Sequence, residues 1–287
     1  MNKYSSYTPE QLEEHLSNFL IDSWSYSRVA SFSRNEKNFE KEEIYGERGR
    51  KGVSAVAGSA YHAALEHYFS HFSDTEQPDL VELQQEAYAY IDRMGADEWK
   101  TGKTTPTVED CIGKATAIST ALVSNFLAEA DSVTSDISEV IGVELRCDEW
   151  LTVNGVDIPL PCHAYIDLAC RTADGRVVII DHKSKSAFTD EKEIALCRGK
   201  QAITYTLCLE SQLGITVDEV RFVENKYSKN KNGEPQLRVD RIVMDADSRT
   251  LYETMLYEPL KRMLQAVSDP DYVYLANDSD TLCDKAE

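Results

Sequence analysis

The sequence predicts an α/β domain preceded by a helical region, and two observations lead to this fold class. From residue 8 to residue 130, apolar residues recur at helical spacing; from residue 137 on, short apolar runs alternate with turn residues. The second part reads as three strands, a helix, two strands and a helix, an order typical of α/β domains. We divide the 287 residues into a helical region at 1–136, a core at 137–267 and an acidic tail at 268–287, which we expect to be flexible, all within one integrated domain.

The helical region contains five predicted segments. Residues 8–22 form a helix that Thr8 caps and Pro9 begins. A helix and a turn follow in the polar and aromatic stretch after residue 22. Apolar residues spaced three and four apart then predict further helices at 58–72, 78–94 and 107–130.

The core begins with three predicted strands between residues 139 and 186. Two turns join them: Val153-Asn154-Gly155, the strongest short hairpin signal in the chain, and Asp174-Gly175. A helix at 190–213 follows, with Gly214 as its C-cap. The remaining expected elements are a strand, a polar loop, a second strand and an amphipathic helix, at 215–228, 230–235, 237–244 and 247–267.

Composition limits the class of protein. Hydrophobic residues make up 42% and charged residues 28%, which is ordinary globular usage and argues against wholesale disorder. No apolar run approaches the roughly 20 residues that span a bilayer, and the N-terminus lacks the apolar centre of a signal peptide. We therefore expect a cytoplasmic protein that makes no membrane contact. The seven cysteines contain no C-x-x-C pair, so the sequence has no local motif for a zinc site or a redox dithiol.

The formal net charge of −20 would by itself oppose a polyanionic partner. Part of the excess lies in the tail, whereas the segment 221–241 carries six basic residues against three acidic ones. A nucleic-acid surface is therefore expected only where basic residues gather or metal ions offset the acids. The basic residues of this segment, Lys226, Lys229 and Lys231 among them, are the predicted phosphate contacts, and an ordinary solvated loop is the alternative.

The most informative segment is an apolar run at 176–180 that ends in Asp181-His182-Lys183. Side chains two apart on a strand share a face, so the Asp181 carboxylate and the Lys183 ammonium lie together at a strand end. Asp167 lies on the preceding strand, across the Asp174-Gly175 turn. Two carboxylates and a lysine converging there would bind a hard divalent cation such as Mg²⁺ or Mn²⁺. The alternative is an exposed ion pair of little energetic consequence.

Five motifs in order give the chain a resemblance over roughly residues 20 to 245. It resembles the RecB-like branch of the PD-(D/E)XK nuclease superfamily, which is related to CRISPR-adaptation and phage exonucleases. The matching pieces are the serine-rich segment 23–27 with Phe32 and Phe39, a G-x-x-x-H-x-x-L-E helix at 58–66, Asp167, the D-x-K at 181–183, and a Q-x-x-x-Y at 201–205. The resemblance implies a restriction-endonuclease-like core, with a mixed β-sheet flanked by helices.

The resemblance also implies roles for particular residues. His62, Asp167, Asp181 and the main-chain carbonyl of His182 would ligate Mg²⁺ or Mn²⁺. Asp167, Asp181 and Lys183 would be catalytic, with Lys183 positioning the attacking water and stabilising the phosphorane charge. Alternatives stay open: His62 could be an ordinary helix-face histidine.

Three further residues complete the implied site. Gln201 and Tyr205, four apart on one helical face, would line it and contact the DNA strand. Without the family, this pair would be an ordinary helix face. For Glu144, two interpretations have equal weight: an auxiliary acid of the site or a solvent-facing strand residue.

Two departures from the family pattern limit what is carried over. Many relatives have four cysteines for an iron–sulfur cluster; here the early position falls in Ser33–Glu36 and the C-terminal region offers only Cys283, so no cluster is predicted. Ala164 stands near Asp167 where a glycine is common. No Walker phosphate loop is present, so a nuclease here would work without its own ATP motor.

The predicted function is a metal-dependent DNA nuclease, an exonuclease of phage or mobile-element recombination, repair or DNA processing. It would hydrolyse phosphodiester bonds with a metal-activated water and leave a 5′-phosphate. The alternatives are a catalytically silent nucleic-acid-binding or interaction module on the same fold and an acidic DNA mimic, which would have no use for Lys183. Polarity, strand preference, oligomeric state and a recombination or replication partner protein stay open.

Overall fold

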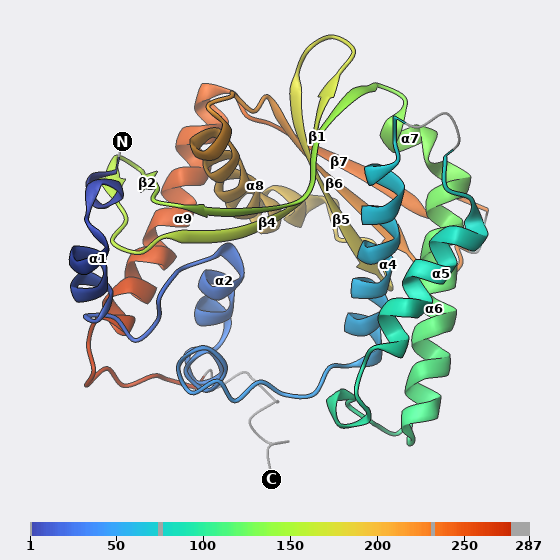
Figure 1. Ribbon diagram of the computed structural model, residues 1–287, viewed down its shortest axis with the longest axis horizontal. Helices are drawn as coiled ribbons and strands as arrows, with labels where there is room; N and C mark the ends of the chain where they lie inside the picture. The colour runs from blue at the N-terminus through green and yellow to red at the C-terminus, as the bar shows by residue number, and fades with distance from the viewer. Residues whose placement is uncertain (1, 74–76, 231–232, 277–287) are drawn as a thin grey trace.

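A five-stranded mixed sheet forms the centre of the computed structural model, which describes residues 2–73, 77–230 and 233–276 (Figure 1). The strand order is β1-β4-β5-β6-β7. Only the β5–β6 pair is parallel; the other neighbours are antiparallel. Strand bounds are Ile137–Glu149 for β1, Cys162–Thr172 for β4, Val177–Lys185 for β5, Glu219–Lys226 for β6 and Leu237–Val243 for β7. The predicted restriction-endonuclease-like α/β fold, a mixed sheet flanked by helices, is confirmed.

Parallel neighbours need a crossover, and α8 (Glu191–Leu213) supplies it between β5 and β6. The other long helices are α4 (Val53–Ser70), α5 (Leu80–Asp92), α6 (Val108–Glu129) and α9 (Ala246–Val267). The shorter helices are α1 (Pro9–Leu16), α2 (Tyr26–Arg34), α3 (Glu36–Phe39) and α7 (Asp131–Thr134), and single turns of other helix types lie at Lys3–Ser6, Glu40–Ile44 and Ala96–Glu98.

Helix α1 begins where the sequence predicts and ends earlier. The Gln11 amide donates to Thr8 Oγ1 at 3.3 Å, and the Thr8 amide donates back to the Gln11 side chain, which together form a capping box. The helix ends at Leu16, six residues before the predicted boundary. The reason is tertiary, because the Leu20 amide donates to the Val267 carbonyl at the end of α9 instead of continuing the helix.

The Asn154-Gly155 turn joins two short strands and not the long strands that the sequence predicts on either side of it. Both residues have the positive φ of a tight hairpin turn (51° and 75°), as expected. They join only β2 (Thr152–Val153) and β3 (Val156–Asp157), a separate two-stranded sheet, rather than the long strands β1 and β4. Pro159 and Pro161 follow directly and have no amide to donate, so the small hairpin cannot extend into the main sheet.

Two apolar cores cover the two faces of the sheet. The α8–α9 core includes residues of α2, α8, α9 and one face of the strands, such as Phe32, Ile203, Leu256, Ile179 and Phe222. The α4–α6 core includes residues of α4, α5, α6 and the other face, such as Ala60, Leu83, Phe126, Val178 and Ile180. Strand β5 contributes alternately to both cores, which explains why its sequence is an unbroken apolar run. Figure 1 shows α8 and α9 on one side of the strands and α4, α5 and α6 on the other.

Helix α6 is, among the described helices, the one that is long and apolar enough to cross a membrane by length and composition. Its buried side chains, including Leu122 and Phe126, pack in the α4–α6 core against α4 and α5. This packing accounts for its apolar character.

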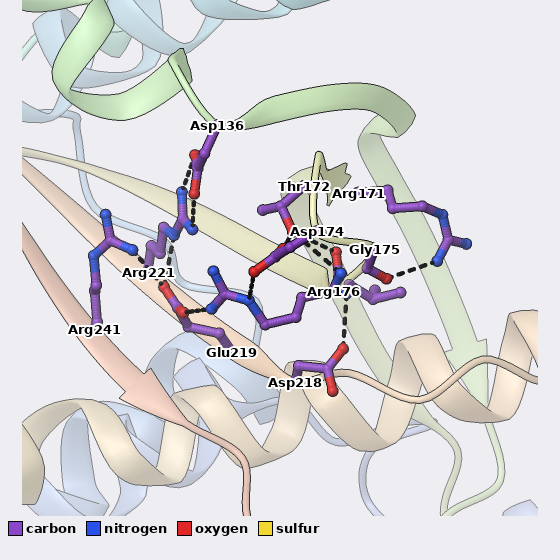
Figure 2. A network of polar contacts seen from close by, with 11 residues as sticks. Asp136, Arg171, Thr172, Asp174, Gly175, Arg176, Asp218, Glu219, Arg221 and Arg241 are labelled. Atoms are coloured by element: carbon purple, nitrogen blue, oxygen red, sulfur yellow. Dashed lines mark hydrogen bonds and ion pairs between the residues drawn. The ribbon is translucent and has the colours of Figure 1, made fainter.

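The arginines of the basic segment 221–241 are not available for the phosphate contacts that its charge count predicts. Arg221 is fully buried and donates to both carboxylate oxygens of Asp136, at 2.8 and 2.6 Å, and to Glu219 at 2.6 Å (Figure 2). Arg238 pairs with Glu224, and Arg241 with Glu219. The three arginines are thus occupied by acids on the same strand, on the neighbouring strand or, for Asp136, 85 positions away in the sequence. Lys229 is exposed, and Lys231 lies outside the described residues, as do residues 277–287 of the tail with Cys283.

This network yields a stability prediction. Arg221→Met should lower the free energy of unfolding by about 3 kcal/mol, because the acids around it would lose a buried partner. Hydrogen bonds from Arg221 hold the pKa of Asp136 below its ordinary 3.8. Their stabilisation is therefore present above that pH and is lost on further acidification, and this part of the acid dependence should vanish in the variant. Urea unfolding at several pH values measures both effects.

The matched control is Arg171→Met, since Arg171 forms a largely exposed pair with Glu139 at 3.3 Å. Its cost should stay below about 1 kcal/mol. Equal costs for the two variants would contradict a structural role for the buried network.

Candidate active site

Two carboxylates meet where β1 and β4 change faces. Val143 pairs with Leu168 and Leu145 with Ile166, so Glu144 and Asp167 lie between the same two pairs on adjacent strands. Leu145 and Ile166 contact the α8–α9 core, whereas Val143 and Leu168 belong to the α4–α6 core. The switch coincides with Glu144, whose φ of 46° lies in the left-handed region, uncommon for a residue other than glycine. Both carboxylates are consequently placed at the border between the two cores, each partly exposed.

Helix α4 brings His62 to this border. His62 Nδ1 lies 3.5 Å from Asp167 Oδ2 and 3.7 Å from Glu144 Oε1. One ligand atom from each of the three residues falls within 4.8 Å of the other two, the spacing of a metal-ligand group. The family resemblance implies His62 and Asp167 as ligands and leaves Glu144 open.

The glycine at the start of the G-x-x-x-H motif lets α4 approach the sheet. A Cβ atom at Gly58 would lie 2.7 Å from Ser184 Oγ on β5, closer than real Cβ contacts. His62 follows one turn later on the same helical face. The close approach at Gly58 therefore sets the depth at which the His62 imidazole reaches the carboxylates.

The electrostatics of the group favour a bound cation. Burial raises the pKa of Asp167, and the neighbouring Asp181 charge raises it further, to about 7. Burial opposes charge on His62, but Asp167 and Glu144 outweigh it and raise the pKa of His62 to about 8. Carboxylates crowded together in this way repel one another, and a divalent cation relieves that repulsion.

The D-x-K pair lies beside this group and is not an exposed ion pair. Leu168 pairs with Ile180, so Asp181 follows on β5 next to Asp167 on β4. Only 1% of the Asp181 side chain is exposed, which rules out the exposed-pair alternative. Lys183 Nζ donates to Asp181 Oδ1 at 2.9 Å; Oδ2 lies 2.7 Å from the same ammonium in an orientation that makes no hydrogen bond. This buried oxygen retains lone pairs for a cation.

Helix α8 presents Gln201 and Tyr205 to the same carboxylate. Gln201 Nε2 lies 3.1 Å from Asp181 Oδ1 and 2.8 Å from Tyr205 Oη, and donates to both. Burial raises the pKa of Tyr205 well above its usual range, and the Asp181 charge adds to the effect. The pair is thus more than an ordinary helix face, because it fixes the orientation of Asp181.

Comparison with known families identifies a superfamily for the chain. The model for the PD-(D/E)XK nuclease superfamily matches residues 23–283. The chain belongs to this superfamily. No curated protein matches the PD-(D/E)XK chain significantly.

Solved structures similar to this PD-(D/E)XK chain include a candidate exonuclease from Eubacterium rectale, with a TM-score of 0.56 at 10% identity over 98% of this chain and 94% of the other. The alkaline exonuclease LHK-Exo from Laribacter hongkongensis matches with a TM-score of 0.31 at 16% identity, covering 76% of this chain and 90% of that enzyme. The structure of LHK-Exo in complex with dAMP matches with a TM-score of 0.32 at 15% identity, covering 74% of this chain and 92% of that enzyme.

The main chain and the side chain of His182, the middle residue of the PD-(D/E)XK signature, lie in different environments. Its amide donates to Asp167 Oδ2 at 2.7 Å, so the main chain lies at the site. Its imidazole turns into the α4–α6 core, with ring centroids 5.6 Å from Phe69 and 6.0 Å from Phe126. Neither ring nitrogen has a hydrogen-bond partner among the described residues, and burial holds the pKa of His182 well below its usual range. The His182 side chain is therefore not a ligand, in keeping with the family resemblance, which implies ligation by the main-chain carbonyl.

The two unpaired nitrogens of His182 predict a gain in stability on substitution. His182→Phe should raise the free energy of unfolding by about 1 kcal/mol, because an aromatic ring keeps the packing and removes two buried polar atoms. Urea unfolding at pH 7 measures the change. His67→Phe, at a partly exposed position on α4, is the control and should stay within about 0.5 kcal/mol of the parent. A less stable His182→Phe variant would mean that the nitrogens have partners.

Glu144 is the PD-(D/E)XK site residue whose role the sequence does not decide. Its left-handed φ and its distance from His62 arise from the folded chain and have no local sequence signal. The one available signal is positional, since Glu144 would lie opposite Asp167 if the first two predicted strands were paired in the right register.

Proposed function

We propose that this PD-(D/E)XK protein is a Mg²⁺- or Mn²⁺-dependent DNA exonuclease, acting in phage or mobile-element recombination, repair or DNA processing. The observation that supports it most is the meeting of His62, Glu144 and Asp167 within 4.8 Å, beside the buried Asp181–Lys183 pair. The exonuclease-like fold of the structural neighbour is in keeping with the proposal.

The residues at the site fit a hard divalent cation. One imidazole nitrogen and the carboxylates of Glu144, Asp167 and Asp181 are available, with the carbonyl of His182 as a further oxygen. Asp181 Oδ2 is a buried carboxylate oxygen that lies 2.7 Å from the Lys183 ammonium and has further lone pairs for a cation. A bound divalent cation would lower the pKa of a water molecule and neutralise phosphate charge.

The protein residues have separate tasks in this proposal. Lys183, held beside Asp181, orients the attacking water and stabilises the negative charge that develops on the phosphoryl group. Gln201 and Tyr205 fix the Asp181 carboxylate and contact the DNA strand. Hydrolysis leaves a product with a 5′-phosphate.

The deciding experiment uses labelled linear and circular DNA, single- and double-stranded, with Mg²⁺, Mn²⁺, Ca²⁺ or excess EDTA. Linear DNA should be degraded with Mg²⁺ and Mn²⁺ and left intact with Ca²⁺, which binds oxygen ligands without supporting turnover, and with EDTA. Intact circles would establish the exonuclease mode. Strong cleavage in EDTA would contradict the metal assignment, and binding without cleavage in any metal would identify a silent binding module.

A further inference from the structure

A polar groove of about 600 Å³ lies between the start of α2 and the strands β1 and β4. The helical side contributes Ser25, Ser27 and Arg28, and the strands contribute Arg146, His163 and Tyr165. None of these six strand and helix residues belongs to the metal-ligand group described above. The groove is a second concave surface on the same two strands.

The groove begins next to the candidate active site. Tyr165 is two residues from Asp167 on β4, and Arg146 is two residues from Glu144 on β1. Tyr165 and Arg146 are themselves register partners across the strand pair. Two residues along a strand span about 7 Å, so a strand of nucleic acid at the carboxylates would reach the groove with its next nucleotide.

Tyr165 is the residue that indicates what the groove binds. The residue is 49% exposed between two buried neighbours, Ala164 and Ile166. Its ring meets the edge of His163 with centroids 5.0 Å apart and planes at 83°, and its hydroxyl makes no hydrogen bond to a described residue. An exposed, laterally supported aromatic ring of this kind is a platform for stacking a base.

The charges of the groove favour bases over the phosphate backbone. Arg28 donates to Glu43 at 2.7 Å, and Arg146 to Asp148 at 2.7 Å. Arg48 also lines the groove and lies 3.6 Å from Glu43, so the three guanidinium groups face the three carboxylates of Asp22, Glu43 and Asp148, which leaves little net attraction for a duplex backbone. The hydroxyls of Ser25 and Ser27, which hydrogen bond to each other at 2.9 Å, offer polar contacts without charge. Bases in a duplex are already stacked and paired, so only an unpaired strand can use such a surface.

We propose that this groove binds an unpaired DNA strand next to the scissile phosphate, with one base stacked on Tyr165. The inference rests on the proposed nuclease function and specifies its substrate class. The preferred substrates are single-stranded DNA and the single-stranded ends of duplexes.

The test measures binding of the full chain in Ca²⁺ to short single-stranded oligonucleotides, each with the fluorescent base 2-aminopurine at one position. Stacking quenches this base, so one position should be strongly quenched. Tyr165→Ala should weaken binding about 10-fold and relieve that quenching, as expected for loss of one stacked base. Tyr165→Phe keeps the ring and should match the parent, and blunt duplex affinity should not change between variants. A circular dichroism melt should give the same transition for the parent and both variants, since the side chain is exposed.

Cleavage in Mn²⁺ separates the inference from the function on which it rests. Tyr165→Ala should raise KM for single-stranded DNA about 10-fold with kcat within threefold of the parent. If the parent cleaves and Tyr165→Ala has an unchanged KM and affinity, the stacking inference is wrong and the nuclease assignment stands. If the parent cleaves no DNA yet binds single strands through Tyr165, the nuclease assignment is wrong and the groove remains a strand-binding site.

Discussion

Replacing Lys183 by alanine should slow DNA cleavage at saturating Mn²⁺ by about 10²-fold or more. The ammonium carries three donors and no acceptor, so it cannot serve as a metal ligand. Its position beside Asp181 suits it to orient water and to stabilise charge in the transition state. Mn²⁺ affinity and DNA affinity should therefore change little, because His62, Asp167 and Asp181 remain.

Single-turnover cleavage and Mn²⁺ titration calorimetry make the comparison. Lys114→Ala, at an exposed position on α6, is the matched control and should cleave at the parental rate. If Lys183→Ala also cleaves at the parental rate in saturating Mn²⁺, Lys183 has no catalytic role and the reacting group lies elsewhere.

Asp181 should behave differently from Lys183, because its loss removes a metal ligand as well as a catalytic group. Asp181→Ala should abolish measurable cleavage, a loss of about 10³-fold or more, and weaken Mn²⁺ binding at least 10-fold. Because Asp181 is buried and accepts from Lys183 and Gln201, the alanine variant will also lose stability. Asp181→Asn keeps the volume and one acceptor oxygen, so it separates the loss of metal binding from the loss of folding.

Thermal unfolding supplies a readout of metal binding that does not depend on activity. A ligand that binds only the folded state raises its melting temperature with concentration. Mn²⁺ should raise the melting temperature of the parent and of Lys183→Ala equally, and that of Asp181→Asn much less. Equal shifts in all three proteins would remove Asp181 from the ligand set.

The parts of the fold that local patterns control were predicted from the sequence. The apolar run of β5 and its polar end gave the position of Asp181 and Lys183. A strand buried on both faces is an unbroken apolar run, and the first polar residues after the run mark the end of the buried part. The capping box at Thr8 fixed the start of α1. The end of α1 was wrong because a contact with α9, distant in sequence, decides it.

Charge and register were harder to predict than apolar spacing. Arg221 counted as a surface cation in the sequence, but its partner Asp136 is 85 positions away and only folding buries the pair. The Asn154-Gly155 signal gave the turn correctly and its strands incorrectly, since the prolines after it limit how far pairing extends. Glu144 stayed undecided for the same reason, because its role depends on alignment with Asp167 across two strands.

The border position of the candidate site ties its geometry to the folding of two separate units. His62 is carried by α4 in the α4–α6 core, whereas Gln201 and Tyr205 are carried by α8 in the α8–α9 core, and β4 and β5 lie between. Proteins open locally, one cooperative unit at a time, at free energies below that of global unfolding. Opening either helical unit would withdraw one half of the residues around Asp167 and Asp181 while the other half stayed in place. Each unit thus controls the whole site, and the less stable of the two sets the temperature at which the site comes apart.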